Sequence, residues 1–182
     1  MKYVIEHMEP KLSEWCYIEY QNISKIVGKN NLIFTNTSNP KLKKLGTIKK
    51  QHVYDLDLKN ACLLDPSARQ TLTPADTKKF KYLVFGGILG DYPRKKRTKP
   101  LAKKLNIPTR NIGKKQMSTD NAVLTCFIIT NRTPFSKIKF KDKLKIEITK
   151  GEEVILPYRY VLINKQPFIS NKIISYLKKH PL

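Results

Sequence analysis

The chain has 182 residues, a length that fits one domain. Its composition is 40% hydrophobic and 9% aromatic, with 7 glycines and 11 prolines, which excludes extensive disorder and the collagen-like class. The formal net charge of +22, from 36 basic against 14 acidic residues, favours an anionic partner such as RNA or the ribosome, although a lysine-rich coding bias would give the same number.

Short apolar strands and helices alternate along the chain. Residues 2–8 predict a buried strand, and residues 13–27 predict a helix that Ser13 caps and Gly28 ends. Further strands are predicted at residues 31–36, 61–65 and 82–85, solvent-facing strands at 138–140 and 143–148, and helices at 40–45, 98–105 and 119–129. This order predicts an α/β fold with a mostly parallel sheet and helices on both faces. We expect a single domain over residues 1–182, with residues 136–182 as a C-terminal extension packed on it.

Membrane and metal-binding patterns are not found in the sequence. No stretch approaches the ~18 uninterrupted apolar residues of a transmembrane helix, and the apolar run near the N-terminus is too short for a signal peptide. The widely spaced Cys16, Cys62 and Cys126 lack the close pairs of a zinc site, so we interpret them as reduced thiols in the core. We therefore expect a cytoplasmic protein with neither a metal nor a membrane partner.

The charge is unevenly distributed. Residues 92–115 contain ten basic residues and no acid, so the run from Arg94 to Lys115 is a candidate RNA contact. In residues 1–24, four acids against two lysines give a local charge of −2. The acids of this acidic island are Glu6, Glu9, Glu14 and Glu19. Coding bias does not readily explain such an island on a basic protein.

The clearest local motif is the string FGGILGD at residues 85–91, which follows a buried strand. Ligands of open parallel sheets bind at the carboxyl ends of strands, where glycine lets the backbone approach a ligand closely. The string is neither GxGxxG nor a Walker motif, so phosphate binding is not predicted. A tight packing turn explains it equally well.

Two other strings stand at similar positions. RNIGKKQMSTD at residues 110–120 precedes the predicted helix at 119–129, and a helix N-terminus is a natural place for ligand contacts. Helix capping explains Ser118, Thr119 and Asp120 but not residues 110–113. LLDP at residues 63–66 ends another strand, where a turn explains it in isolation.

Together the three strings resemble the SPOUT superfamily of S-adenosylmethionine-dependent methyltransferases. They resemble most closely the branch whose yeast member methylates an arginine of a small-subunit ribosomal protein. MKYVIEHMEP and SEW near the N-terminus and LPYRYV near the C-terminus support that branch. The resemblance implies a deep trefoil knot in the C-terminal half, S-adenosylmethionine as the cofactor and a monomeric enzyme.

The resemblance also implies a cofactor pocket built from the three strings. The implied cofactor-binding residues are Leu64, Asp65, Gly86, Gly87, Ile88, Leu89, Gly90, Asp91, Arg110, Asn111, Ile112, Gly113, Gln116, Met117 and Thr119. Asp91 and Arg110 would stand near the methyl-donor end of the cofactor or near its carboxylate. A large side chain at Gly87 is expected to exclude the cofactor while the fold survives.

The preferred hypothesis is a protein-arginine N-methyltransferase that acts on a small-subunit ribosomal protein or on the ribosome. A guanidinium stays protonated, so carboxylates must orient it, hold its charge and accept a proton as the methyl group moves. The candidate catalytic residues are Asp91, Arg110, Glu14 and Glu19. Glu19 lies nearer the apolar stripe of the first helix than Glu14 and is the better candidate. Trp15 could stack on the guanidinium, but a core position is the preferred interpretation.

Two alternatives stay open at this point. One is an RNA methyltransferase of the same fold acting on tRNA or rRNA, with the basic run at residues 94–115 on the phosphates. The other is a non-catalytic module that binds the ribosome or RNA.

Overall fold

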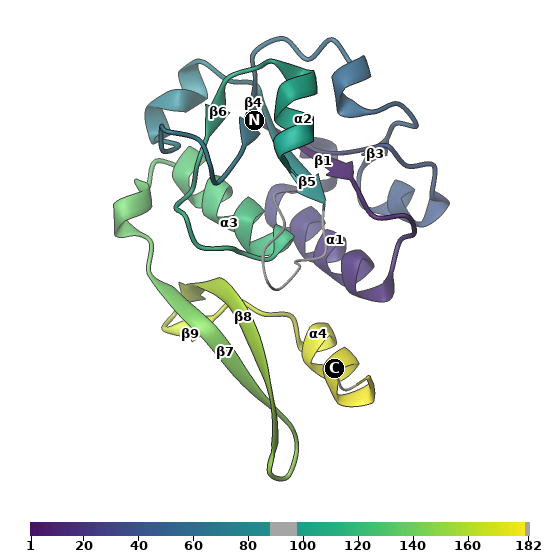
Figure 1. Ribbon diagram of the computed structural model, residues 1–182, viewed down its shortest axis with the longest axis vertical. Helices are drawn as coiled ribbons and strands as arrows, with labels where there is room; N and C mark the ends of the chain where they lie inside the picture. Colours follow the sequence, from purple (N-terminus) through teal and green to yellow (C-terminus); the bar gives the residue numbers. More distant parts are fainter. Residues whose placement is uncertain (88–97, 181–182) are drawn as a thin grey trace.

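The computed structural model of the chain describes residues 1–87 and 98–180 (Figure 1). Its centre is a six-stranded sheet in the order β3-β2-β1-β5-β4-β6, in which every pairing is parallel. The strands are β1 (Lys2–His7), β2 (Leu32–Thr35), β3 (Thr47–Ile48), β4 (Ala61–Leu64), β5 (Tyr82–Gly87) and β6 (Thr109–Arg110). The predicted α/β fold with a mostly parallel sheet is confirmed. Strands β3 and β6 were not predicted, because two residues are too few for a strand period to be recognised.

Helices cover both faces of this sheet. Helices α1 (Glu14–Val27) and α3 (Thr119–Thr130) pack on one face and α2 (Thr98–Leu105) packs on the other (Figure 1). On β1, Tyr3 and Ile5 belong to the core under α1 and α3, whereas Val4 belongs to the core under α2. Successive strand residues point to opposite faces, so a strand covered on both sides is apolar at nearly every position.

Helix α1 begins and ends where the sequence predicts. The Ser13 hydroxyl accepts a hydrogen bond from the Cys16 N–H at 3.2 Å, a cap that contributes about 1 kcal/mol. Gly28 ends the helix with a φ of 80°, a conformation that glycine adopts without steric cost. Ile23 of α1 packs against the sheet, and Ile18 packs against the C-terminal part of the chain.

The C-terminal residues form an antiparallel sheet and a helix. The elements are β7 (Phe140–Thr149), β8 (Glu152–Ile163), β9 (Gln166–Pro167) and α4 (Asn171–Lys179). The β7–β8 hairpin projects from the body of the molecule, with α4 beside it (Figure 1). Leu156, Ile173 and Leu177 bury this part against Ile18 of α1. Of the two predicted solvent-facing strands, the one at residues 143–148 lies within β7, whereas the one at residues 138–140 overlaps β7 only at Phe140. β8 and α4 were not predicted, and their apolar residues pack against a helix from the opposite end of the chain.

The three cysteines are free and buried, as predicted. Burial raises the pKa of the Cys16 thiol to about 11 and that of the Cys62 thiol to about 12, so both stay protonated at neutral pH. Among the helices of residues 1–87 and 98–180, none is long and apolar enough to cross a membrane.

Gly87 lies at a crowded point between β1 and α1. A Cβ atom added there would collide with the Tyr20 hydroxyl and would lie 2.7 Å from Ile5 Cγ2. The packing at this point argues against the expectation that a large side chain at Gly87 leaves the fold intact, because even a Cβ atom would have to displace Tyr20 or Ile5.

The substitution Gly87→Ala should lower the free energy of unfolding by about 1–3 kcal/mol, since overpacking must displace Tyr20 or Ile5. Chemical denaturation of the variant and the wild type measures the difference. Lys150→Ala is the control, because Lys150 is exposed and its substitution creates no overpacking. Equal stability of Gly87→Ala and the wild type would contradict this packing.

Candidate active site

The carboxyl ends of β1 and β5 form the topological switch point of the sheet. The chain leaves β1 through α1 towards β2 and β3, and it leaves β5 through α2 towards β6 on the opposite side. In open parallel sheets such a divergence creates the crevice in which ligands bind. Gly86 and Gly87 end β5 at this point. The predicted cofactor residues Ile88, Leu89, Gly90 and Asp91 follow them and lie outside the described residues.

Strand pairing brings the three sequence strings to one end of the sheet. Strand β4 lies between β5 and β6, and Leu64 at its end is paired with Arg110 of β6. Leu64 and Ile112 are buried in the same core cluster, and Met117 packs against that cluster. Residues from all three strings are therefore neighbours, as a single cofactor pocket requires.

Asn111 fixes the conformation of the loop after β6. Its Oδ1 accepts hydrogen bonds from the Gly113 N–H at 3.0 Å and the Thr71 hydroxyl at 3.1 Å, and its Nδ2 donates to the Ala68 carbonyl at 2.9 Å. Gly113 has a φ of 90°, and a Cβ atom there would lie 2.9 Å from Phe135. Both the backbone conformation and the space thus require glycine at this position.

Arg110 is engaged in an ion pair. Its Nη2 lies 3.0 Å from Asp76 Oδ1, and its guanidinium carbon lies 5.2 Å from the centroid of the Phe80 ring. Although burial raises the pKa of Asp76, hydrogen bonds from Arg110 and Thr73 lower it overall. The backbone carbonyl of Arg110 accepts a hydrogen bond from the Asp65 N–H at 2.9 Å. The ion pair argues against the predicted catalytic role of the Arg110 side chain and favours a structural one.

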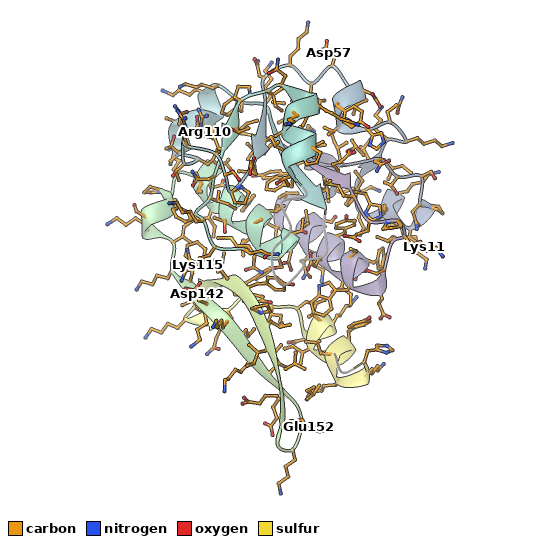
Figure 2. The ribbon with its side chains drawn as sticks, viewed as in Figure 1. Lys11, Asp57, Arg110, Lys115, Asp142 and Glu152 are labelled. Atoms are coloured by element: carbon orange, nitrogen blue, oxygen red, sulfur yellow. The ribbon has the colours of Figure 1, made fainter. Side chains whose placement is uncertain are left out.

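The base of the β7–β8 hairpin holds the segment between Gly113 and the start of α3. The Arg159 N–H donates to the Gln116 carbonyl at 2.8 Å. Asp142 accepts from Lys115 Nζ at 2.6 Å and from Arg159 Nε at 2.7 Å, and these hydrogen bonds lower the pKa of its carboxyl. Lys115 and Asp142 lie where the hairpin joins the body of the molecule, far from Glu152 at its tip (Figure 2). The LPYRYV string thus contributes Arg159 to the support of the predicted cofactor loop.

Two buried carboxylates meet at the N-terminus of α3. Glu19 of α1 is 6% exposed and accepts hydrogen bonds from Trp15 Nε1 at 2.8 Å and from the Thr119 N–H at 3.2 Å. Asp120 is 4% exposed and accepts from the Ser118 hydroxyl at 2.6 Å and from Asn22 Nδ2 at 2.9 Å. In the described part of the chain neither carboxylate forms an ion pair. This pair lies directly beside Thr119, one of the implied cofactor residues.

The proximity of the two carboxylates shifts their pKa values. Burial and then the Asp120 charge raise the pKa of Glu19 to about 8, and burial raises that of Asp120. Burial, followed by the charges of these two acids, also raises the pKa of the Tyr160 hydroxyl. The pair therefore holds a proton near neutral pH and remains ready to exchange it.

Only part of this pair is predicted by the sequence. Glu19 was preferred to Glu14, and Glu14 is exposed, as the helix geometry predicted. Asp120 was interpreted as a helix cap, and Asn22, one turn from Glu19 on the same stripe of α1, was not considered. Trp15 is half-buried, with its ring 5.8 Å from that of Tyr176, which agrees with a core position.

The acidic island does not act as one surface. Glu6 is 2% exposed and accepts hydrogen bonds from the Val53 N–H at 2.9 Å and from the Thr35 hydroxyl. His52 Nδ1 lies 2.6 Å from its other carboxylate oxygen. Glu6 therefore joins β1 to neighbouring segments and is not available to a substrate.

Comparison with known proteins assigns the family. A family model described as protein arginine N-methyltransferase SFM1-like matches residues 2–181. The chain belongs to this family. The protein arginine N-methyltransferase SFM1 of Saccharomyces cerevisiae is 40% identical over 204 residues, which cover 98% of this chain and 95% of the yeast protein. The crystal structure of yeast SFM1 complexed with SAH superposes with a TM-score of 0.90 at 37% identity, covering 97% and 94% of the two chains.

A more distant solved structure shares the fold. A dual specific Trm10 from Thermococcus kodakaraensis has a TM-score of 0.59 at 15% identity, covering 72% of this chain and 94% of that protein. At this identity the likeness concerns the fold alone.

The raised pKa of Glu19 predicts how stability depends on pH. A carboxyl whose pKa is about 8 in the folded protein and near 4.5 in the unfolded chain makes the folded state bind more protons between those values. Its contribution to stability is therefore complete below about pH 4.5 and is lost as the pH rises through about 8. Thermal unfolding should show a Tm that falls between about pH 5 and 8, with a smaller slope in Glu19→Gln. The exposed Glu14→Gln is the control, and an unchanged slope in Glu19→Gln would refute the assignment.

The hairpin contacts predict local protection of the cofactor loop. Asp142→Ala removes the acceptor shared by Lys115 and Arg159, so amide hydrogen exchange of residues 113–117 should rise about two- to fivefold, as for a partly exposed ion pair. Glu153→Ala is the matched control, since it removes only the Lys145 pair farther along the hairpin. Mass spectrometry of exchanged peptides measures both variants. The same increase in both would show that Asp142 does not hold the loop.

Proposed function

We propose that this protein is an S-adenosylmethionine-dependent protein-arginine N-methyltransferase whose target is an arginine of a small-subunit ribosomal protein. The carrying observation is the buried pair of Glu19 and Asp120, to which no basic residue of the described chain is bound. Two such carboxylates on a protein of net charge +22 form a local site for a cation. Family membership and the yeast relative support the methyltransferase activity.

The residues at the strand ends fit S-adenosylmethionine. Leu64 and Ile112 are buried and Met117 packs beside them, so this end of the sheet offers apolar surface to an adenine ring. The Asn111 network fixes a loop whose backbone amides can bind the edge of that ring. When bound, the cofactor supplies an electrophilic methyl group on a sulfonium. The structure of the yeast relative complexed with SAH supports this class of cofactor.

The two carboxylates have different roles in this proposal. A carboxylate offers about four acceptor positions, and Asp120 receives hydrogen bonds from Ser118, Asn22, and both the N–H and the side chain of Asn121. Glu19 accepts hydrogen bonds from Trp15 and Thr119, which leaves an acceptor position for a guanidinium N–H. Glu19 is therefore the better group to bind the substrate, and Asp120 raises the pKa of Glu19.

Proton balance supports the same assignment. Transfer of a methyl group to a guanidinium nitrogen releases one proton, because the methylated guanidinium keeps a single positive charge. Because the pKa of Glu19 is raised to about 8, its carboxyl holds a proton in the free protein near neutral pH, and binding of the cationic guanidinium would displace that proton to solvent. The carboxylate formed in this way can then accept the proton that methyl transfer releases. Asp120 acts through Glu19 by raising its pKa.

We propose further that the enzyme acts as a monomer in the cytoplasm and that the segment from residue 109 to 118 closes the trefoil knot. The net charge of +22 opposes self-association. For the knot, the support is that Asn111 is bonded to the backbone of both Ala68 and Gln70, so the two loops are in close contact. The ribosomal target rests on the sequence strings shared with that branch, and an additional RNA contact from Arg94 to Lys115 rests on charge alone.

One labelling experiment separates the possible substrates. The protein is incubated with methyl-labelled cofactor and with ribosomes from cells that lack the enzyme. Label in a small-subunit protein, recovered as methylarginine after hydrolysis, would support the proposal. Label in RNA would favour the RNA methyltransferase, and cofactor binding without any transfer would favour the non-catalytic module.

The carboxylate roles predict a separation between catalysis and cofactor binding. Glu19→Gln should lower methyl transfer at least about a hundredfold, since it removes both the charge and the proton acceptor. Cofactor affinity, measured by calorimetry, should stay within about twofold. Glu14→Gln should keep full activity, because Glu14 is exposed. Wild-type activity in Glu19→Gln would exclude Glu19 as the acceptor.

A further inference from the structure

A second surface, away from the carboxylate pair, has the composition of a nucleic-acid site. Between Tyr20 and Tyr54 the chain has seven basic residues and no acid. They are Lys25, Lys29, Lys41, Lys43, Lys44, Lys49 and Lys50, here called the lysine edge. All seven are exposed, and none forms an ion pair with a described residue. Their charge is therefore not neutralised within the described chain.

The fold gathers these lysines along one edge of the sheet. β3 is the outer strand, and the Ser24 hydroxyl of α1 donates to the Leu45 carbonyl at 2.7 Å, which joins the end of α1 to the segment before β3. The Lys49 N–H donates to the Phe34 carbonyl at 2.8 Å and fixes the segment after β3 on β2. The hairpin and α4 lie elsewhere in the molecule (Figure 1). The lysine edge is thus formed by the end of α1, the turns before β2 and β3, and the segment after β3.

An aromatic stack lies at the end of the lysine edge. The rings of His52 and Tyr54 are 4.6 Å apart with an interplanar angle of 11°, and Lys104 Nζ of α2 lies 4.5 Å from the Tyr54 centroid. The His52 side chain is 41% exposed, while Glu6, bonded to its Nδ1, is buried. The ring is therefore held in one orientation and still accessible. Flat, accessible rings among basic side chains are the means by which proteins hold single-stranded nucleic acids.

We propose that the lysine edge and His52 bind single-stranded RNA, with lysines on the phosphates and a base stacked on His52. An acidic protein partner fits less well. Protein interfaces need apolar anchors, and the large exposed hydrophobic residues of the described chain are Met1, Ile155 and Ile163, none of which belongs to this edge. The edge has no arginine, the residue that pairs bidentately with a carboxylate. Lysines act as point charges, which match a row of phosphates. This inference is independent of the methyl transfer proposed above.

The test compares two triple variants of the full chain. Lys43→Gln/Lys49→Gln/Lys50→Gln removes three charges from the lysine edge, and Lys78→Gln/Lys79→Gln/Lys81→Gln removes three exposed lysines elsewhere. Fluorescence anisotropy with a labelled single-stranded oligoribonucleotide measures affinity over a range of salt concentrations. The edge variant should lose at least tenfold in affinity, and the slope of log K against log salt should fall by about 2. The control should stay within about threefold of the wild type.

A single variant tests the aromatic stack. His52→Gln keeps a donor for Glu6 and removes the ring, so RNA affinity should fall about fivefold or more with an unchanged salt slope. If its thermal melt shows that His52→Gln does not fold, Tyr54→Leu tests the same stack. Equal losses in the two triple variants would overturn the proposal in favour of diffuse charge. Competition by polyglutamate as effective as that by unlabelled RNA would overturn it in favour of an acidic protein.

Discussion

The buried carboxylate pair at the N-terminus of α3 connects most parts of this protein. Glu19 joins α1 to the first residue of α3, and Asp120 joins the same turn to Asn22 of α1. Asn121, the next residue, accepts from the Val161 N–H and donates to the Phe168 carbonyl, so the C-terminal strands are attached at the same point. Helix, sheet and C-terminal part therefore meet at one polar cluster inside an apolar core. Burying two like charges is costly, and neighbouring donors together with a retained proton make it tolerable.

The cost of burying a charge without partners explains where the acidic residues lie. Several of them are used inside the molecule: Glu6 beside His52, Asp76 with Arg110, and the pair at α3. The surface is accordingly more basic than the composition alone indicates. A cationic substrate side chain would be repelled at long range by such a protein, but salt screens this repulsion beyond about 8–10 Å. At contact distance the buried carboxylates dominate, because a low-dielectric environment strengthens their attraction for a cation.

The C-terminal hairpin fixes the position of α1 and of the segment before α3. It packs on α1 through an apolar cluster, and it bonds the segment before α3 through Arg159 and Asp142. The loop that would hold a cofactor is thus fixed from both sides, by Asn111 on the sheet and by the hairpin. The groups proposed to bind the substrate and the cofactor both adjoin α3, so its N-terminus would determine their relative position. Such fixed alignment is what methyl transfer between two bound molecules requires.

The sequence by itself determined the α/β class, the limits of α1 and α2, the buried cysteines and the three strings that meet at the strand ends. These depend on local periodicity, on caps and on glycine, all of which are visible within a few residues. Tertiary structure alone decided that Gly87 faces Tyr20, that Arg110 is paired with Asp76, and that Glu6 is withdrawn from the acidic island. It also decided that Glu19 meets Asp120, about a hundred residues later in the chain. The physical reason is that a carboxylate's role depends on its burial and its neighbours, and these come from distant segments that no local pattern specifies.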